Sequence, residues 1–281
     1  MKQFIANVFQ RFPDRMRGKQ RIGRWLLKAL HMSNNATQIQ GDFGLNYYLP
    51  NLLENVSFEI FVNGTFEKET VEAIFAIVRN ISHEAVVLDI GANIGSIALP
   101  LAARSKNTKI YCIEASPRVF QFLKKNIEIN RMDANVLPHN VCLSNARTEF
   151  VDFFSPIEQF GKGSLSPVFT SVAENVKNQS LDRFVREHAI KKVDFIKIDV
   201  EGFESQVFKS GADLLSPSDA PDILFEVCDW AESLAGNQAG DSQRILKEYG
   251  YRLYDSERAN APIKDISSAA FAMILASKNR S

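Results

Sequence analysis

The apolar run at residues 86–90 ends in a glycine-rich turn, GANIG, whose residue types suit ligand binding. Gly91 and Gly95 permit a tight turn and let the backbone approach a ligand closely. Glu114 ends the next apolar run, where a carboxylate can accept hydrogen bonds from both hydroxyls of a ribose. The alternative is a helix cap with no ligand, and the pairing with Glu114 argues against it. The turn therefore predicts a nucleotide-type cofactor site.

The spacing of the turn separates two classes of cofactor. A dinucleotide fingerprint reads GxGxxG, whereas here Asn93 stands at the second glycine position and the spacing is GxxxG. A pyrophosphate needs that bare backbone, but an aminoacyl chain on a sulfonium does not. Asp89 would repel a phosphate, yet it can orient an ammonium group directly or through water. We therefore expect S-adenosylmethionine rather than NAD, bound by Asp89, Gly91, Ala92, Asn93, Gly95 and Glu114.

Asn140 is the seventh residue that we assign to this cofactor site. It lies in the apolar run after Glu114 and either faces the adenine or caps a turn.

A second group of residues suits the chemistry of an acceptor. The strand-like run VDFIKIDV carries Lys197 and Asp199 on one alternating face, Glu201 follows it, and Glu226 ends the run DILFEV. Unpaired buried charges are unfavourable, so these groups must pair with each other or serve a site at the ends of the strands.

Three readings of Lys197, Asp199, Glu201 and Glu226 remain open. Asp199 or Lys197 accepts or relays the acceptor proton, with a pKa tuned by burial and by the partner charge. Alternatively, Lys197 and a carboxylate form an ion pair that fixes the turn beside the cofactor. In a third interpretation the carboxylates bind a divalent cation, but the positive charge of Lys197 argues against a metal ion there. We favour the catalytic reading and predict no metal site, because strand ends at the switch point of a sheet are where sites form.

Apolar runs and helical patterns alternate from residue 86 to residue 227 and predict the fold class. This alternation requires right-handed crossovers and a parallel sheet covered on both faces. The last strands, near YRLYD and AAFAMILAS, are joined by a loop, so we expect an antiparallel pair. A loop at residues 153–167, with two glycines, is expected to cover the acceptor.

Residues 1–65 form a predicted basic helical extension to a catalytic domain of residues 66–281. Residues 4–12 and 22–30 carry apolar side chains at helical spacing, and residues 1–30 hold eight Lys or Arg against Asp14 alone. The helices either lie on an anionic membrane surface or pack on the catalytic domain or a second subunit, and we favour packing. The segment FEIFV, before Asn63, is predicted as a short strand.

Composition limits the partners and the location. The formal net charge is zero, so no overall charge recruits nucleic acid. No apolar stretch is long enough for a transmembrane helix, and the N-terminus lacks the features of a signal peptide. The three cysteines are scattered in apolar runs, which is typical of buried reduced thiols. We expect a cytoplasmic protein, with peripheral contact at the inner membrane surface as the open alternative.

Five blocks of the sequence, in order, resemble the FkbM family of class I methyltransferases over roughly residues 70–275: LDIGANIG, IYCIEASPRVFQFLKKNIEIN, SLDRF, VDFIKIDVEGFESQVFKSGADLL and PDILFEV. The resemblance implies a Rossmann-like three-layer α/β sandwich with a seven-stranded, mainly parallel sheet whose last strand is antiparallel. It also implies S-adenosylmethionine as methyl donor and a hydroxyl acceptor on a sugar, polysaccharide or other natural product. An NAD-dependent oxidoreductase and a catalytically idle cofactor-binding scaffold are the alternative functions.

Overall fold

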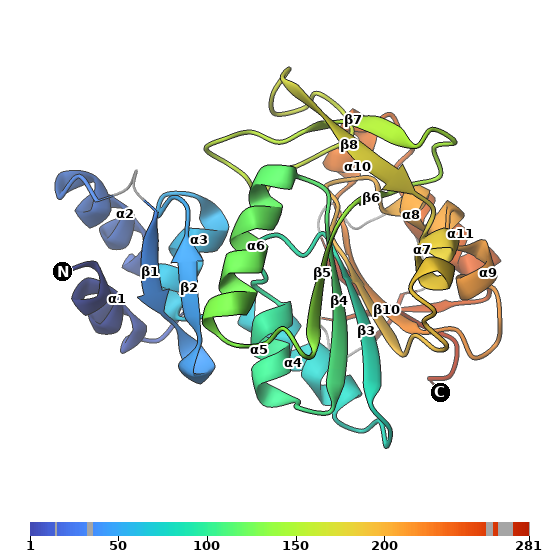
Figure 1. The fold of residues 1–281 in the computed structure, drawn as a ribbon, viewed down its shortest axis with the longest axis horizontal. Coiled ribbons are helices and arrows are strands. Elements are labelled where there is room, and N and C mark those ends of the chain that lie inside the picture. Colours follow the sequence, from blue (N-terminus) through green and yellow to red (C-terminus); the bar gives the residue numbers. More distant parts are fainter. Residues whose placement is uncertain (15, 33–35, 257–260, 264–271, 281) are drawn as a thin grey trace.

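A large sheet forms the centre of the computed structural model, which describes residues 1–14, 16–32, 36–256, 261–263 and 272–280 (Figure 1). Eight strands of the described chain lie in the order β12-β11-β13-β10-β9-β3-β4-β5. Their bounds are β3 Ala85–Ile90, β4 Thr108–Glu114, β5 Val136–Asn140, β9 Phe195–Ile198, β10 Asp222–Val227, β11 Arg252–Asp255, β12 Ala261–Pro262 and β13 Ala272–Ser277.

The directions of the strands confirm the predicted Rossmann-like class. β5, β4, β3, β9 and β10 pair in parallel, and β13 runs antiparallel between β10 and β11. The last two long strands are therefore an antiparallel pair, as expected. The predicted count of seven differs by one, because the two-residue β12 pairs with β11. Part of the predicted run AAFAMILAS, residues 269–271, lies outside the described residues.

Helices cover both faces of the sheet, because successive strand residues point to opposite faces and are apolar on both. Val87 and Ile110 lie in one hydrophobic cluster, and their neighbours Leu88 and Tyr111 lie in another. The first cluster includes side chains of α4 Lys68–Val78, α5 Ala98–Arg104 and α6 Pro117–Ile129. The second includes side chains of α7 Leu181–Glu187, α8 Glu204–Lys209, α9 Ala212–Leu215 and α11 Asp241–Glu248.

A small second sheet lies beyond the carboxyl ends of β3 and β4 (Figure 1). It contains β6 Cys142–Leu143, β7 Phe150–Phe154 and β8 Ala173–Gln179. The helix α10 Asp229–Leu234 follows β10 at the same end of the molecule. These additions cover the edge where parallel sheets form their sites.

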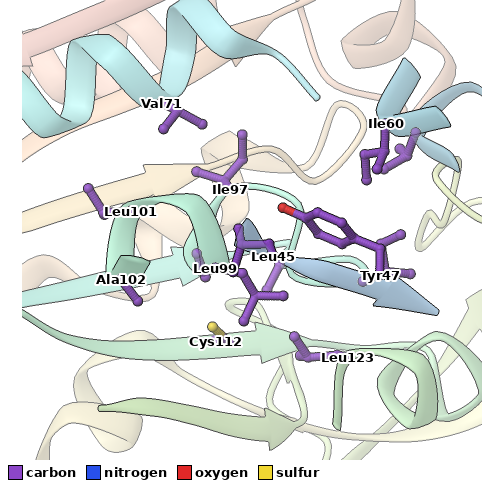
Figure 2. Packing of buried hydrophobic residues seen from close by; sticks show 14 of the residues in the cluster. Leu45, Tyr47, Ile60, Val71, Ile97, Leu99, Leu101, Ala102, Cys112 and Leu123 are labelled. Atoms are coloured by element: carbon purple, nitrogen blue, oxygen red, sulfur yellow. The ribbon is translucent and has the colours of Figure 1, made fainter. Parts of the chain in front are cut away.

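The N-terminal part packs on α6 and shares the core of the sheet. It contains α1 Lys2–Gln10, α2 Lys19–Ala29, β1 Thr37–Gln40, a 3-10 turn η1 Asp42–Gly44, β2 Asn46–Leu49 and α3 Asn55–Asn63. Figure 2 shows Leu45 and Tyr47 beside Leu99 of α5, in the cluster that also contains Leu123 of α6. The division at residue 65 stays a prediction, but the buried side chains are continuous across it.

The predicted strand FEIFV is wrong, because these residues lie within α3. The Glu54 carboxylate accepts a hydrogen bond from the Ser57 N–H at 3.1 Å and caps the helix, and Gly64 ends it at φ 84°. Most of the helix is buried, so its apolar residues lack the one-sided spacing that identifies a surface helix. No helix within the described chain has both the length and the apolar character to cross a bilayer.

Asn126 of α6 joins the N-terminal part to the turn after β3. Its Oδ1 accepts a hydrogen bond from the Tyr48 N–H at 2.6 Å, and its Nδ2 donates one to the Ile94 carbonyl at 2.9 Å. The side chain is fully buried. Its amide therefore satisfies backbone groups from two separate segments.

We expect Asn126→Ala to lower the free energy of unfolding by about 2–4 kcal/mol, because two backbone groups lose their partner. Denaturant unfolding measures this change. Asn80→Ala, at an exposed asparagine whose side chain donates to the Ala76 carbonyl, is the control and should change stability by less than about 1 kcal/mol. Equal effects of the two substitutions would contradict the role given to Asn126.

Candidate functional site

One cavity opens at the carboxyl ends of β3, β4, β9 and β10, and we call it the site cavity. It brings together seven of the residues singled out in the sequence: Gly91, Asn93, Glu114, Lys197, Asp199, Glu201 and Glu226. The predicted cofactor turn and the predicted acceptor strand therefore line the same space.

Gly91 makes this proximity sterically feasible. Its φ is +79°, and a Cβ atom there would lie 1.9 Å from the carbonyl oxygen of Asp199. The N–H groups of Gly91 and Ala92 both donate to the Ile113 carbonyl, at 2.9 and 3.0 Å. Only glycine fits such a close approach of two backbones at positive φ. The turn after β3 is thus held between the ends of β4 and β9.

Glu114 is oriented by the backbone at the edge of the cavity. Its Oε2 accepts a hydrogen bond from the Asn93 N–H at 2.9 Å, and its Oε1 accepts one from the Ser116 N–H at 2.8 Å. Burial raises the pKa of Glu114 to about 7, although these two hydrogen bonds and Lys197 act in the opposite direction. A carboxylate has about four lone-pair sites, so two remain for hydroxyl groups. The arrangement fits the ribose of an adenosyl group.

Four predicted cofactor residues lie beside the cavity rather than on its lining: Asp89, Ala92, Gly95 and Asn140. Asp89 is buried beneath the turn, with Oδ1 3.8 Å from the Lys197 Nζ. The amide of Asn140 donates to the carbonyls of Glu114 and Ala115 at 2.8 and 3.0 Å. Asp89 and Asn140 therefore support the backbone and charges around the cavity. Direct contact of Asp89, Ala92, Gly95 and Asn140 with a cofactor stays a prediction.

Lys197 is the buried cation of the acceptor side. Its Nζ lies 3.4 Å from Asp199 Oδ2, and the residue is 4% exposed. Burial alone would lower the pKa of Lys197, but the carboxylates of Asp199 and Asp89, with those of Glu67 and Glu226, raise it above its ordinary value. Lys197 therefore stays protonated at neutral pH.

Carboxylates outnumber cations around this lysine. Burial raises the pKa of Glu226 to about 9, and repulsion from Asp199 and Glu201 adds to the effect. Burial and the charge of Asp199 also raise the pKa of Glu201 to about 7. Carboxyl groups in a cavity whose pKa values differ strongly from their ordinary values are typical of functional sites.

Sequence reasoning missed two acidic residues of the cavity, Glu54 and Glu67. Burial raises the pKa of each to about 7, and Asp199 further raises that of Glu67. Glu54 is the cap of α3, and Glu67 precedes α4 with φ 42°. In the sequence both resemble ordinary acids at helix starts. The tertiary packing of α3 and of the segment before α4 brings them to the cavity.

The predicted covering loop of residues 153–167 differs at its start, because residues 153 and 154 belong to β7. The segment reaches the cavity through Phe153, Phe160, Gly161, Lys162, Gly163 and Leu165. A Cβ at Gly161 would lie 2.9 Å from Glu54 Oε1, so the loop contacts the start of α3 closely. The charge of Lys162 acts on Glu201 and opposes the rise of its pKa. The loop therefore lies between the N-terminal part and the turn after β9.

Metal binding was the third reading of the acidic group. Over the ranges that the structure describes, no group of three His, Cys, Asp or Glu residues has an arrangement suited to a metal ion. The Lys197 ammonium instead lies within 4 Å of two carboxylates, those of Asp89 and Asp199.

We expect Glu114→Ala to weaken binding of S-adenosylmethionine about 100-fold, because two charge-assisted hydrogen bonds to the ribose are lost. Isothermal titration calorimetry measures the affinity, and circular dichroism checks the fold. Glu128→Ala, at an exposed acid of α6, should bind like the unmodified protein. Unchanged affinity in Glu114→Ala would place the cofactor elsewhere.

The acidic cluster also predicts a pH dependence of stability. The folded state raises the pKa of Glu226 from 4.5 to about 9, so it holds this proton more tightly than the unfolded state does. The stability contributed by Glu226 is present below pH 4.5 and is lost as the pH rises towards 9.

Glu226→Gln removes the ionisable group, so the Tm of the variant relative to the unmodified protein should rise steadily from pH 5 to pH 9. Differential scanning calorimetry across this range measures the difference, and exposed Glu128→Gln serves as control. A Tm difference that is constant or falls with pH would show that Glu226 is ionised in the folded protein.

Segments of this chain are similar to several known proteins. AMB antimetabolite synthetase AmbE of Pseudomonas aeruginosa is 24% identical over 246 residues, which cover 75% of this chain and 11% of that protein. Hexuronic acid methyltransferase AglP of Haloferax volcanii is 27% identical over 138 residues, 49% of this chain and 54% of that protein. A tRNA (guanine(37)-N(1))-methyltransferase of Phytophthora infestans is 30% identical over 83 residues, 30% of this chain and 19% of that protein.

The chain spans about a tenth of the first relative and about half of the second. The family model of the methyltransferase FkbM domain matches residues 89–253, more than half of the chain. The matched range includes the turn after β3, Glu114 and the Lys197 strand. The chain therefore belongs to the FkbM family of S-adenosylmethionine-dependent methyltransferases.

Proposed function

We propose that this chain transfers a methyl group from S-adenosylmethionine to a hydroxyl of a sugar, polysaccharide or other natural product. The observation that carries the proposal is the single cavity that contains both Glu114 and the Lys197–Asp199 pair. Glu114 would hold the ribose, and Gly91 and Asn93 would border the aminoacyl end. When bound, the cofactor supplies an electrophilic methyl group on a sulfonium.

Asp199 is the base in this proposal, because Lys197 keeps its proton. The Lys197 ammonium donates to Asp199 Oδ2, which leaves Oδ1 to accept the proton of the acceptor hydroxyl. The methyl group would bond to the acceptor oxygen as its bond to sulfur breaks, and Asp199 would accept the hydroxyl proton. The chain's other contribution is alignment and exclusion of water by the 153–167 loop.

The charges of the cavity favour an acceptor without an anionic group. Its described lining has two cations, Lys162 and Lys197, and six carboxyl groups: Glu54, Glu67, Glu114, Asp199, Glu201 and Glu226. An acceptor carboxylate would add a further negative charge and be repelled. Neutral sugar hydroxyls can instead donate to carboxylates and accept from carboxyls that remain protonated. AglP, by its name, acts on a hexuronic acid, so the two acceptors would differ in charge.

Incubation with labelled S-adenosylmethionine and a fractionated host extract tests the activity. We expect label in a neutral, hydroxyl-bearing product. Binding of NADH, with no binding of S-adenosylhomocysteine, would instead support an oxidoreductase. Binding of S-adenosylhomocysteine without transfer to any fraction would support the idle scaffold.

We expect Asp199→Asn to reduce turnover by about 10²- to 10⁴-fold, the usual contribution of a general base. Affinity for S-adenosylmethionine should change less than about threefold, because Asn keeps the shape of the side chain. Steady-state kinetics and calorimetry separate the two effects. Asp219→Asn, at an exposed residue before β10, is the matched control. Turnover that survives in Asp199→Asn would remove Asp199 from the mechanism.

A further inference from the structure

The helices α1 and α2 expose large apolar side chains that the fold does not use. Phe4 is 72% exposed and Trp25 is 67% exposed. Six further exposed apolar residues belong to the same region: Met1, Val8, Phe12, Met16, Ile22 and Leu30. On α1 the exposed residues Phe4 and Val8 lie four positions apart and share one face of the helix, and exposed Phe12 follows just beyond the helix end. Contiguous exposed apolar surface marks an interaction site.

The packed sides of both helices are separate from this surface. α1 buries Ala6 and Phe9, and α2 buries Gly23 and Leu27. A Cβ at Gly23 would lie 3.1 Å from Phe58 and Val62, so α2 lies close against α3 through a small residue. These inner residues pack on α3 and β1, which both lie within the predicted extension of residues 1–65, so packing of the helices on the catalytic domain stays a prediction. Phe4 and Trp25, in contrast, expose most of their surface to solvent.

The two helices are held firmly in place. Arg24 donates to the Leu53 carbonyl at 2.7 Å and to Asn55 Oδ1 at 2.9 Å, and its guanidinium stacks on Phe58. Gln10 donates to the Gln40 carbonyl at 3.2 Å. The exposed surface is thus fixed on the folded molecule.

The same surface is basic. Residues 1–30 hold eight Lys or Arg and one acid, Asp14, whereas the whole chain has no net charge. Arg11, Arg17, Arg21 and Lys28 are exposed, and Asp14 pairs with the buried Lys19. Both helices lie together at one end of the molecule (Figure 1). Positive charge and exposed apolar side chains therefore coincide there.

We propose that α1 and α2 dock on the surface of an anionic lipid bilayer. Phe4, Trp25 and their apolar neighbours enter the boundary between headgroups and acyl chains, and the arginines contact lipid phosphates. Amphipathic basic helices with Trp and Phe on the apolar face bind bilayers in this way. A second copy of the chain fits less well, because a symmetric contact would bring two strongly basic surfaces together.

Sedimentation of the full chain with vesicles tests the proposal. We expect binding to vesicles of phosphatidylglycerol and phosphatidylcholine, weak binding to phosphatidylcholine alone, and loss of affinity as salt increases. A double variant, F4S with W25S, should bind at least about tenfold less, because it loses two large apolar anchors. A triple variant, R17Q with R21Q and K28Q, should lose about fivefold for each charge, on anionic vesicles only.

A double variant at equally exposed apolar residues outside the surface, I157S with V172S, is the matched control and should bind like the unmodified chain. In a W230F background, the fluorescence of Trp25 should shift to shorter wavelength when anionic vesicles are added. Circular dichroism and S-adenosylmethionine binding verify that each variant is folded.

Equal binding to neutral and anionic vesicles, or equal loss in the control variant, would overturn the proposal. A different result would also overturn it: the unmodified chain does not bind vesicles but forms a dimer, and F4S with W25S abolishes that dimer. That result would assign the surface to a second copy. Because the surface lies apart from the catalytic residues, vesicle binding and methyl transfer can fail independently.

Discussion

The buried ammonium of Lys197 is the interaction on which the site depends. It lies between the carboxylates of Asp199 and Asp89, and the register of β3 and β9 places Asp89 directly beside Lys197. Removing one partner of such a buried group typically costs about 3–5 kcal/mol, since the remaining charges lose their compensation. The lysine therefore permits several acids to gather at the ends of two central strands. It also remains a cation, which leaves proton transfer to a carboxylate.

The close contact between Gly91 and the Asp199 carbonyl joins the two halves of the site. The turn that borders the cofactor and the strand that carries the proposed base meet there without an intervening side chain. Glu114, on the other side of β3, is oriented by the N–H of Asn93 in that same turn. A displacement at Gly91 would thus affect both the cofactor contacts and the base. The N-terminal part completes the cavity with Glu54, and the Asn126 amide links its Tyr48 N–H to the Ile94 carbonyl within this turn.

Much of this arrangement could be predicted from local sequence. The alternation of strands and helices defines a parallel sheet, and the ends of its strands fall at the turn, at Glu114 and at the KIDVEG segment. Residues that reach the cavity by tertiary packing carry no such signal. In the sequence, Glu54 and Glu67 resemble ordinary acidic residues at the starts of helices. The segment that forms α3 resembles a strand, because the helix is mostly buried and its sequence is therefore apolar on most sides. Asn140 lies beside Glu114 at the ends of β5 and β4, as expected. Its amide donates hydrogen bonds to two carbonyls, which no sequence pattern reveals.

A crystal structure of the chain with bound S-adenosylhomocysteine tests the central claim most directly, namely that one cavity aligns the methyl donor with the Lys197–Asp199 pair. We expect both ribose hydroxyls within hydrogen-bond distance of Glu114, and the sulfur facing Asp199. A ribose bound away from Glu114, or a sulfur directed away from β9, would contradict the assignment of this cavity as the site of methyl transfer.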